Sequence, residues 1–120
     1  MEDSPILRDF VVEAIAENEK TTVVGYADTE SDAIEGVMKF KPDVVIIDIK
    51  LRVGNGINVL RQIKKMKVFG SIVAIVLTNY AFDIYQNRCM ALGADYFLDK
   101  STQFEQLKQI LGRLAQVGKA

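Results

Sequence analysis

The sequence predicts an α/β fold, a doubly wound parallel sheet with helices on both faces. Two runs of apolar, mostly β-branched residues, 44–47 and 72–77, do not alternate with polar residues. Continuous runs of this kind are typical of strands that are covered on both faces. Between the runs the apolar residues recur with a helical period, so strands and helices alternate. This alternation predicts crossover connections, a parallel sheet and helices on its two faces.

The elements of the N-terminal half are expected in the order helix, strand, helix, strand. An apolar stripe over residues 7–15 predicts a helix, which Ser4-Pro5 opens as a cap followed by proline. Residues 21–26 form a weaker strand signal. A second stripe over residues 33–40 predicts a helix that Pro42 ends, and the strand at 44–47 follows.

The C-terminal half continues the alternation. The predicted elements are a helix over 59–66, the strand at 72–77, a helix over 82–92, a weaker strand at 96–98 and a helix over 104–117. We expect Gly93 to close the fourth helix in a left-handed conformation, and Ser101 or Thr102 to cap the last. The stripe that begins at Phe82 and Tyr85 is predicted to face the core, and Cys89 to be buried.

Composition excludes several classes of protein. The 120 residues are 49% hydrophobic and 26% charged, as in one soluble globular domain over residues 1–120. Fifteen basic against sixteen acidic residues give a net charge of −1, which argues against a direct nucleic-acid binder. There is no histidine for a Ser-His-Asp triad, and one cysteine cannot form an internal disulfide. No apolar stretch predicts a membrane span or signal peptide, so a cytoplasmic location is expected.

Polar residues stand where the predicted strands end. Asp48 and Thr78 follow the two strong strands, Lys100 follows the last one, and Glu2-Asp3 lies just before the first helix. The carboxyl ends of parallel strands meet at one edge, where function collects. Clustered carboxylates would repel one another unless a hard cation such as Mg²⁺ neutralised them. Asp48 could then act as a nucleophile toward a phosphoryl group, with Lys100 and Thr78 stabilising the transferring charge.

Each of these residues taken alone also has a structural interpretation. Asp48 could be a turn or helix-capping residue, and Thr78 a β-branched residue that ends a strand. Lys100 could be a solvated lysine paired with its neighbour Asp99, and Glu2-Asp3 could favour the start of the first helix through its dipole. Their occurrence together at successive strand ends favours the chemical interpretation.

Several motifs resemble one family over essentially all 120 residues. They are Val-Val-Ile-Ile-Asp48, Leu77-Thr78, the segment Ala-Leu-Gly-Ala-Asp-Tyr-Phe-Leu-Asp-Lys100-Ser, the opening Glu2-Asp3-Ser-Pro, and Gly56 in the loop after the strand at 44–47. The combination resembles the receiver domain of two-component response regulators, which has a flavodoxin-like fold. The resemblance implies that Asp48 accepts a phosphoryl group from a sensor histidine kinase, whose histidine lies on another protein.

The resemblance also implies roles for the other residues. It implies Mg²⁺ binding by Glu2, Asp3, Asp48 and the backbone carbonyl of Lys50. Thr78 and Lys100 would contact the phosphoryl oxygens. Phe97 would occupy the aromatic position that changes rotamer together with Thr78.

Three positions depart from the family pattern. Met1 stands directly before Glu2, so the usual first strand, central in the family order 2-1-3-4-5, is apparently truncated or absent. Another copy could fill such a gap, as in a homodimer or a strand-swapped dimer, or the second and third strands could pair directly. Arg52 replaces a frequent proline and is expected to leave its loop less restrained. Asn79 replaces a small residue and is expected to narrow access to Asp48.

Three hypotheses for function follow. The first is a phosphorylation-controlled signalling switch, not an enzyme beyond possible self-dephosphorylation, which changes its surface for a downstream protein target or a fused output domain. The second is a receiver-like interaction module that is not phosphorylated because the first strand and metal site are incomplete. The third is an aspartate-nucleophile phosphatase of the haloacid-dehalogenase type. That chemistry needs a second acid two residues after the nucleophile, where this chain has Lys50.

Overall fold

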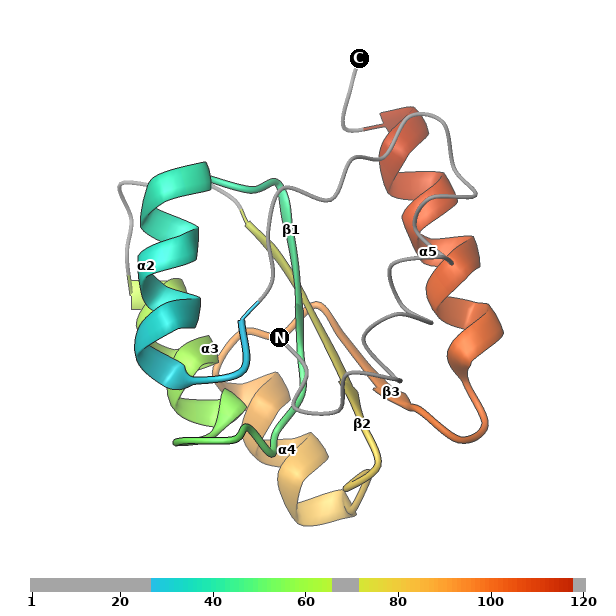
Figure 1. Ribbon diagram of the computed structural model, residues 1–120. Helices are drawn as coiled ribbons and strands as arrows, with labels where there is room; N and C mark the ends of the chain where they lie inside the picture. Colours follow the sequence, from blue (N-terminus) through green and yellow to red (C-terminus); the bar gives the residue numbers. More distant parts are fainter. Residues whose placement is uncertain (1–26, 66–71, 118–120) are drawn as a thin grey trace.

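Strands and helices alternate along the chain (Figure 1). The computed structural model describes residues 27–65 and 72–117. The elements are α2 (Glu30–Phe40), β1 (Val44–Ile47), α3 (Gly56–Lys65), β2 (Val73–Thr78), α4 (Asp83–Ala91), β3 (Tyr96–Asp99) and α5 (Phe104–Val117). The helix predicted over 7–15, the strand predicted over 21–26 and the expectation about a first strand lie outside the described residues. So do Glu2 and Asp3.

The three described strands form a parallel sheet in the order β1-β2-β3. Val44 pairs with Val73, and Ile75 pairs with Tyr96. The predicted strands at 44–47, 72–77 and 96–98 are therefore confirmed to within one residue at each end. Because α3 connects β1 to β2 and α4 connects β2 to β3, each connection returns the chain to the same end of the sheet.

Helices cover both faces of the sheet, as the sequence predicts. Helices α2, α3 and α4 lie on one side of the strands and α5 on the other (Figure 1). Ala74 and Val76 of β2 belong to the hydrophobic cluster on the first side, and Ile75 and Leu77 belong to the cluster with α5. All four side chains are at most 1% exposed. A strand buried on both faces needs apolar residues at every position, which is why the run does not alternate.

Two helix ends follow their sequence signals. Gly93 comes after α4 with φ +103°, the left-handed conformation predicted for it. Helix α2 ends at Phe40 before Pro42, and Lys41 between them has φ 47°. At the other end of α2, the Thr29 side chain accepts a 3.2 Å hydrogen bond from the Asp32 N–H, so Thr29 caps the helix.

Two local predictions are wrong. Helix α5 begins at Phe104, and Ser101 Oγ donates at 2.6 Å to Asp99 Oδ1 instead of capping the helix. Phe82, expected in the core, is 58% exposed, because it is the residue before α4 and lies beyond the helix that faces the sheet. The rest of that stripe agrees with prediction in part: Tyr85 is half-buried and Cys89 is buried.

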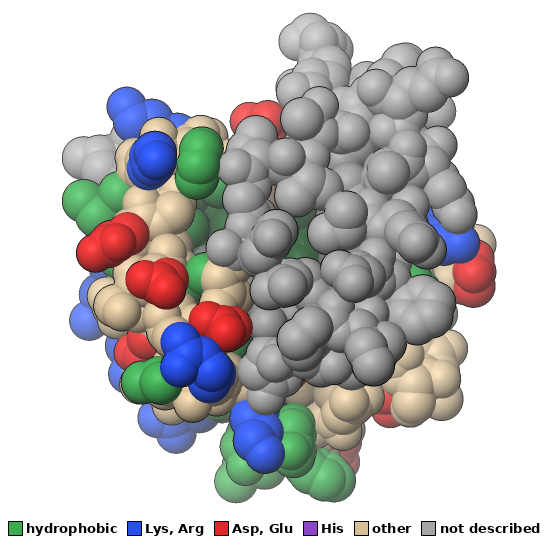
Figure 2. Space-filling model, viewed as in Figure 1, with side chains coloured by type: hydrophobic (Ala, Val, Ile, Leu, Met, Phe, Trp, Pro, Cys, Tyr) green, Lys and Arg blue, Asp and Glu red, His purple; other side chains and the backbone are tan. Residues whose placement is uncertain are grey.

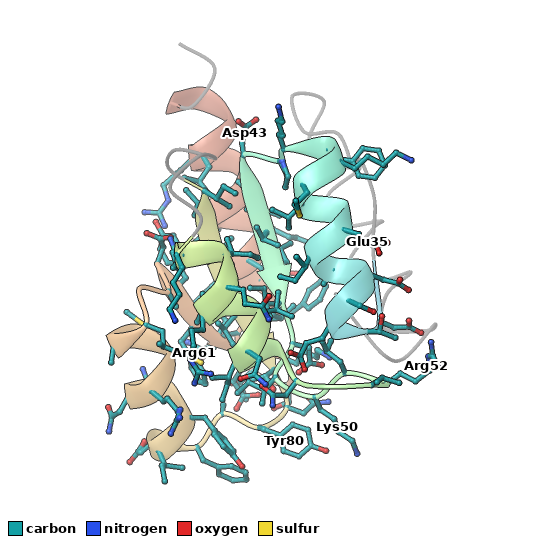
Figure 3. The ribbon with its side chains drawn as sticks, turned by 90° about the vertical axis from the view of Figure 1, so that its left-hand side faces the viewer. Glu35, Asp43, Lys50, Arg52, Arg61 and Tyr80 are labelled. Atoms are coloured by element: carbon teal, nitrogen blue, oxygen red, sulfur yellow. The ribbon has the colours of Figure 1, made fainter. Side chains whose placement is uncertain are left out.

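The two ends of the sheet differ in character. Asp43 lies at the end where β1 begins, whereas Lys50 and Tyr80 lie at the opposite end, after β1 and β2 (Figure 3). Hydrophobic side chains gather at the lower end of the molecule, near the start of α4 (Figure 2). Tyr80, Phe82 and Ile84 are exposed there. None of the helices described has the length and apolarity that a bilayer crossing requires.

Candidate functional site

Three polar side chains meet at the carboxyl edge of the sheet. Asp48 follows β1, Thr78 is the last residue of β2, and Lys100 follows β3. Their residues are 5%, 0% and 9% exposed, so each is buried although each is polar or charged. Burial of such groups costs free energy unless they are hydrogen-bonded or paired, so each is expected to have a polar partner.

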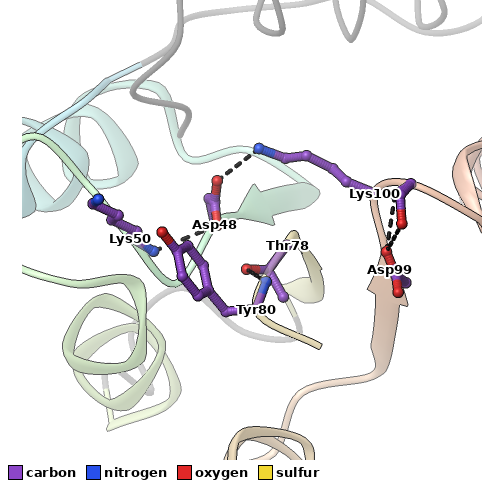
Figure 4. Close-up of polar contacts among 7 residues, drawn as sticks. Asp48, Lys50, Thr78, Tyr80, Asp99 and Lys100 are labelled. Carbon is purple, nitrogen blue, oxygen red and sulfur yellow. Dashed lines mark hydrogen bonds and ion pairs between the residues drawn. The ribbon is translucent and has the colours of Figure 1, made fainter. Parts of the chain in front are cut away.

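Asp48 and Lys100 form a buried ion pair. Lys100 Nζ lies 2.7 Å from Asp48 Oδ2, and the two side chains are 5% and 6% exposed. The contact joins the ends of β1 and β3 across β2 (Figure 4). Fifty-two residues separate the partners in sequence. Lys100 is therefore not the solvated lysine of the structural interpretation, and its partner here is Asp48.

Thr78 lies between these two residues on the middle strand. Its side-chain oxygen accepts a 3.0 Å hydrogen bond from the Tyr80 N–H. Because a threonine hydroxyl can donate as well as accept, its own proton is left for another acceptor. The backbone oxygen of Thr78 accepts from the Lys100 N–H at 3.0 Å, so the main chains of these two residues are fixed to each other.

The turn after β3 positions Lys100. The Asp99 carboxylate accepts hydrogen bonds from the Ser101 hydroxyl at 2.6 Å and the Ser101 N–H at 2.9 Å. These bonds, the hydroxyl's first, stabilise the ionised carboxylate and lower the pKa of Asp99 from its ordinary value of 3.8. Asp99 thus holds the turn closed, and the Lys100 side chain extends from this turn to Asp48.

Lys50 approaches Asp48 through its main chain. Its N–H donates to Asp48 Oδ1 over a long 3.4 Å. The side chain points away from the carboxylate, with its ammonium 6.0 Å from the centre of the Tyr80 ring (Figure 4). Asn79, which is expected to narrow access to Asp48, is exposed.

Gly56 closes the loop that follows Asp48. Its N–H donates to the Ile49 carbonyl at 2.7 Å. A β-carbon at this position would overlap the backbone carbonyl oxygen of Asp48 and lie 2.6 Å from Ile47 Cγ2. Only glycine allows the start of α3 to approach the backbone of Asp48 this closely.

Phe97 lies on the middle of β3, two residues before Asp99. Val76 pairs with Phe97 and Thr78 with Asp99, so Phe97 and Thr78 lie on adjacent strands with their side chains toward the same face. Phe97 is half-buried and packs against the hydrophobic cluster that includes Val76.

The donors for a metal ion are described only in part. Glu2 and Asp3 lie outside the described residues. Within residues 27–65 and 72–117, no group of three or more His, Cys, Asp and Glu side chains could hold a metal ion. The two expected ligands that are described, the Asp48 carboxylate and the Lys50 carbonyl, are hard oxygen donors of the kind that Mg²⁺ takes.

Contacts of Arg52 were missed by the sequence analysis. Its loop, expected to be less restrained than one with proline, is held because the Arg52 N–H donates to the Asp28 carbonyl at 2.8 Å. Arg52 Nε also lies 3.0 Å from Asp28 Oδ2. Arg52 and Asp28 are 24 positions apart, and no periodic pattern predicts their contact. The sequence offers one signal, an acidic residue just before the start of a helix.

The sequence model described as response regulator receiver domain matches residues 1–112, most of the chain. This chain belongs to that family. The receiver domain is 32% identical over 111 residues to the sensory transduction protein LytT of Bacillus anthracis, covering 92% of this chain and 44% of LytT. It spans about half or less of the length of the curated relatives it matches first.

Solved structures show the same fold. The signal receiver domain of a DNA-binding response regulator from Colwellia psychrerythraea superposes with a TM-score of 0.87 at 24% identity, covering 96% of this chain and 94% of that one. The phosphorylated cyanobacterial phytochrome response regulator RcpA gives 0.79 at 22% identity, covering 97% and 88%. The family assignment identifies the chain as a receiver domain of two-component systems and argues against the hypothesis of a haloacid-dehalogenase-type phosphatase.

Proposed function

We propose that this receiver domain is a phosphorylation-controlled switch in which Asp48 accepts a phosphoryl group from a sensor histidine kinase. The observation that carries the proposal is the buried Asp48–Lys100 ion pair, 2.7 Å long, beside the buried Thr78 hydroxyl. A nucleophilic carboxylate, a fixed ammonium and a hydroxyl donor are the groups that phosphoryl transfer to an aspartate uses.

The transfer makes one bond and breaks one bond. A carboxylate oxygen of Asp48 bonds to phosphorus, while the bond from phosphorus to the donor's imidazole nitrogen breaks and leaves its electron pair on nitrogen. The Lys100 ammonium, which already contacts this carboxylate, would then contact a phosphoryl oxygen. Thr78 would donate its hydroxyl proton to another phosphoryl oxygen, since its own oxygen already accepts from the Tyr80 N–H.

Glu2, Asp3, Asp48 and the Lys50 carbonyl would hold Mg²⁺, which supplies positive charge against the phosphoryl oxygens. The described part of this set supports the assignment in two ways. The Lys50 main chain lies beside the Asp48 carboxylate through a 3.4 Å hydrogen bond. The Lys50 side chain points away, so its own ammonium does not occupy that side of Asp48.

The conformational change would be transmitted from the phosphorylation site to the surface beside β3. Movement of Thr78 toward a phosphoryl group would vacate space on the face that it shares with Phe97, and the half-buried Phe97 ring would repack. That change would alter the surface beside β3, α4 and α5 for a downstream protein target or a fused output domain. We propose that residues 1–120 form a single domain and that the protein is cytoplasmic. We propose that it has no enzymatic activity beyond self-dephosphorylation.

Incubation with acetyl phosphate and Mg²⁺, followed by intact mass spectrometry, tests the proposal. We expect a mass gain of one phosphoryl group that requires Mg²⁺ and is lost in Asp48→Asn. Asp83→Asn is the matched control, because it removes an exposed carboxylate in the first turn of α4, which follows β2. No mass gain in folded protein would contradict the switch and favour the interaction module that is not phosphorylated.

A further inference from the structure

The loop after the acceptor strand, residues 49–55, is fastened to the segment that begins α2. The Arg52 N–H donates to the Asp28 carbonyl at 2.8 Å, and the Glu30 N–H donates to the Val53 carbonyl at 3.0 Å. Thr29 and Val53 form a parallel bridge between these bonds. The tip of the loop is therefore paired with residues 28–30 as a very short parallel ladder.

Two side-chain contacts reinforce the ladder. Arg52 Nε lies 3.0 Å from Asp28 Oδ2, and the Asn55 N–H donates to Glu30 Oε2 at 3.1 Å. We call Asp28, Glu30, Arg52 and Asn55 the loop clasp. Figure 3 shows Arg52 beside the start of α2. The Arg52 side chain is 61% exposed, and ion pairs so exposed contribute little to stability. We therefore expect the loop clasp to fix the position of the loop, with little effect on the stability of the fold.

The position that it fixes is the main chain at Lys50. At its base the loop is closed by the Gly56 N–H, which donates to the Ile49 carbonyl, and by an antiparallel bridge between Lys50 and Asn55. The clasp holds the other end of the same loop. Lys50 lies between these two anchors, and its N–H points at Asp48 Oδ1.

We propose that Asp28, Glu30 and Arg52 are positioning residues for the phosphorylation site. Asp28 and Glu30, at the start of α2, hold Arg52 and Asn55 of the loop, and the loop in turn holds the Lys50 main chain against the Asp48 carboxylate. The inference rests on the proposed function, since it concerns how the same site is arranged. It also gives Arg52 a role that proline could not fill, because proline has no N–H to donate to Asp28.

Release of the clasp is expected to affect phosphorylation more than stability. Without the side-chain contacts, the tip of the loop is held by the backbone ladder alone, and the Lys50 N–H and carbonyl would sample a wider range of orientations toward Asp48. Residues that orient the ligands of a metal site commonly change affinity or activity by 10- to 100-fold when they are lost. We expect phosphorylation by acetyl phosphate to become about tenfold slower. This value is the lower end of that range, because the clasp is exposed.

The first variants remove one contact each. Arg52→Met keeps the aliphatic stem and removes the guanidinium, and Glu30→Leu removes the carboxylate that accepts from Asn55. Both should slow Mg²⁺-dependent phosphorylation and raise the Mg²⁺ concentration that gives half the maximal rate. Glu30→Gln keeps an acceptor oxygen and should remain close to wild type. Exchange of the two charges in Asp28→Arg with Arg52→Asp should recover most of the rate lost in either single variant.

The matched control breaks an ion pair at the opposite end of the sheet. Lys64 Nζ contacts Asp95 Oδ2 at 3.2 Å and the Ile72 carbonyl at 2.8 Å. Lys64→Met should therefore lower the urea midpoint at least as much as Arg52→Met, yet leave the phosphorylation rate unchanged. If Lys64→Met slows phosphorylation as much as Arg52→Met does, the effect is one of stability and the inference is wrong.

A second readout does not depend on phosphorylation. Without Mg²⁺ or phosphodonor, Arg52→Met should shift the Lys50 amide resonance and speed its hydrogen exchange, whereas Lys64→Met should not. An unchanged Lys50 amide together with an unchanged rate would overturn the inference. If the wild-type protein accepts no phosphoryl group, the proposed function fails. The Lys50 amide then decides the positioning by itself, and an unchanged amide in Arg52→Met overturns it.

Discussion

Removal of Lys100 would leave the Asp48 carboxylate buried without the ammonium that contacts it at 2.7 Å. Lys100→Met makes this change with little loss of side-chain volume. Asp48→Asn makes the reciprocal change, and the double variant replaces both charges by neutral groups. The three variants together measure how strongly the two ends of the site depend on each other.

The expected magnitude follows from the geometry. At an effective dielectric constant of about 20, two unit charges 2.7 Å apart attract each other by roughly 6 kcal/mol. Desolvation of two side chains that are only 5% and 6% exposed costs several kcal/mol for each ion, so the pair as a whole contributes little. Loss of one ion removes the attraction, whereas the desolvation cost of the remaining buried ion persists. We expect Lys100→Met to lower the free energy of unfolding by about 3 kcal/mol.

Asp48→Asn should cost less, about 2 kcal/mol, because a long lysine side chain can turn its ammonium toward water. The double variant should lie within about 2 kcal/mol of wild type, because neither buried charge remains. Urea unfolding followed by circular dichroism in chelator-treated buffer gives each free energy by linear extrapolation. Costs that simply add, with a coupling energy below about 0.5 kcal/mol, would refute the claim that the buried pair acts as a unit.

Further predictions concern Gly56, Asp99 and Cys89. Gly56→Ala should lower the free energy of unfolding by about 1–3 kcal/mol in urea titrations, since its β-carbon would overlap the Asp48 carbonyl; a change near zero would contradict this close approach. The pKa of Asp99 is lowered in the folded state, so its contribution to stability is present above the unfolded pKa and is lost as pH falls through the lower folded value. NMR titration should show that Ser101→Ala raises this pKa, and an unchanged value would show that the hydroxyl is not its main cause. Burial raises the pKa of the Cys89 thiol above 9.0, which outweighs the opposite effect of Arg88. Iodoacetamide at pH 8 should therefore label Cys89 slowly in folded protein and rapidly in urea, and equal rates would place the thiol at the surface.

The sequence predicts the sheet well because burial on both faces leaves a strong local signal. Residues 44–47 and 72–77 are apolar at every position, and runs of this length are typical of strands and short for a buried helix. The same topology brings Asp48 and Lys100 together although 52 residues separate them, since parallel strands end at a common edge. The geometric part of the site is thus accessible from sequence, whereas the roles of its residues remain proposals.

The sequence predicts helix ends and loop contacts less well. Phe40 and Phe82 match the helical period, yet they are 45% and 58% exposed because they lie at the ends of their helices, where the apolar face no longer meets the sheet. The contact of Arg52 with Asp28 depends on how two loops fold toward each other, and neither loop has a periodic pattern. Such contacts follow from the three-dimensional arrangement, which local spacing does not encode.

The site of phosphorylation is the central claim, and the position of the phosphoryl group tests it most directly. Protein treated with acetyl phosphate and Mg²⁺ would be reduced with borohydride, which converts an aspartyl phosphate to homoserine, and mapped by tandem mass spectrometry. The account predicts homoserine at position 48 in the sample with Mg²⁺, and unmodified Asp48 in the samples without Mg²⁺ or without phosphodonor. Modification at another carboxylate, or none in protein shown to be folded, would contradict it.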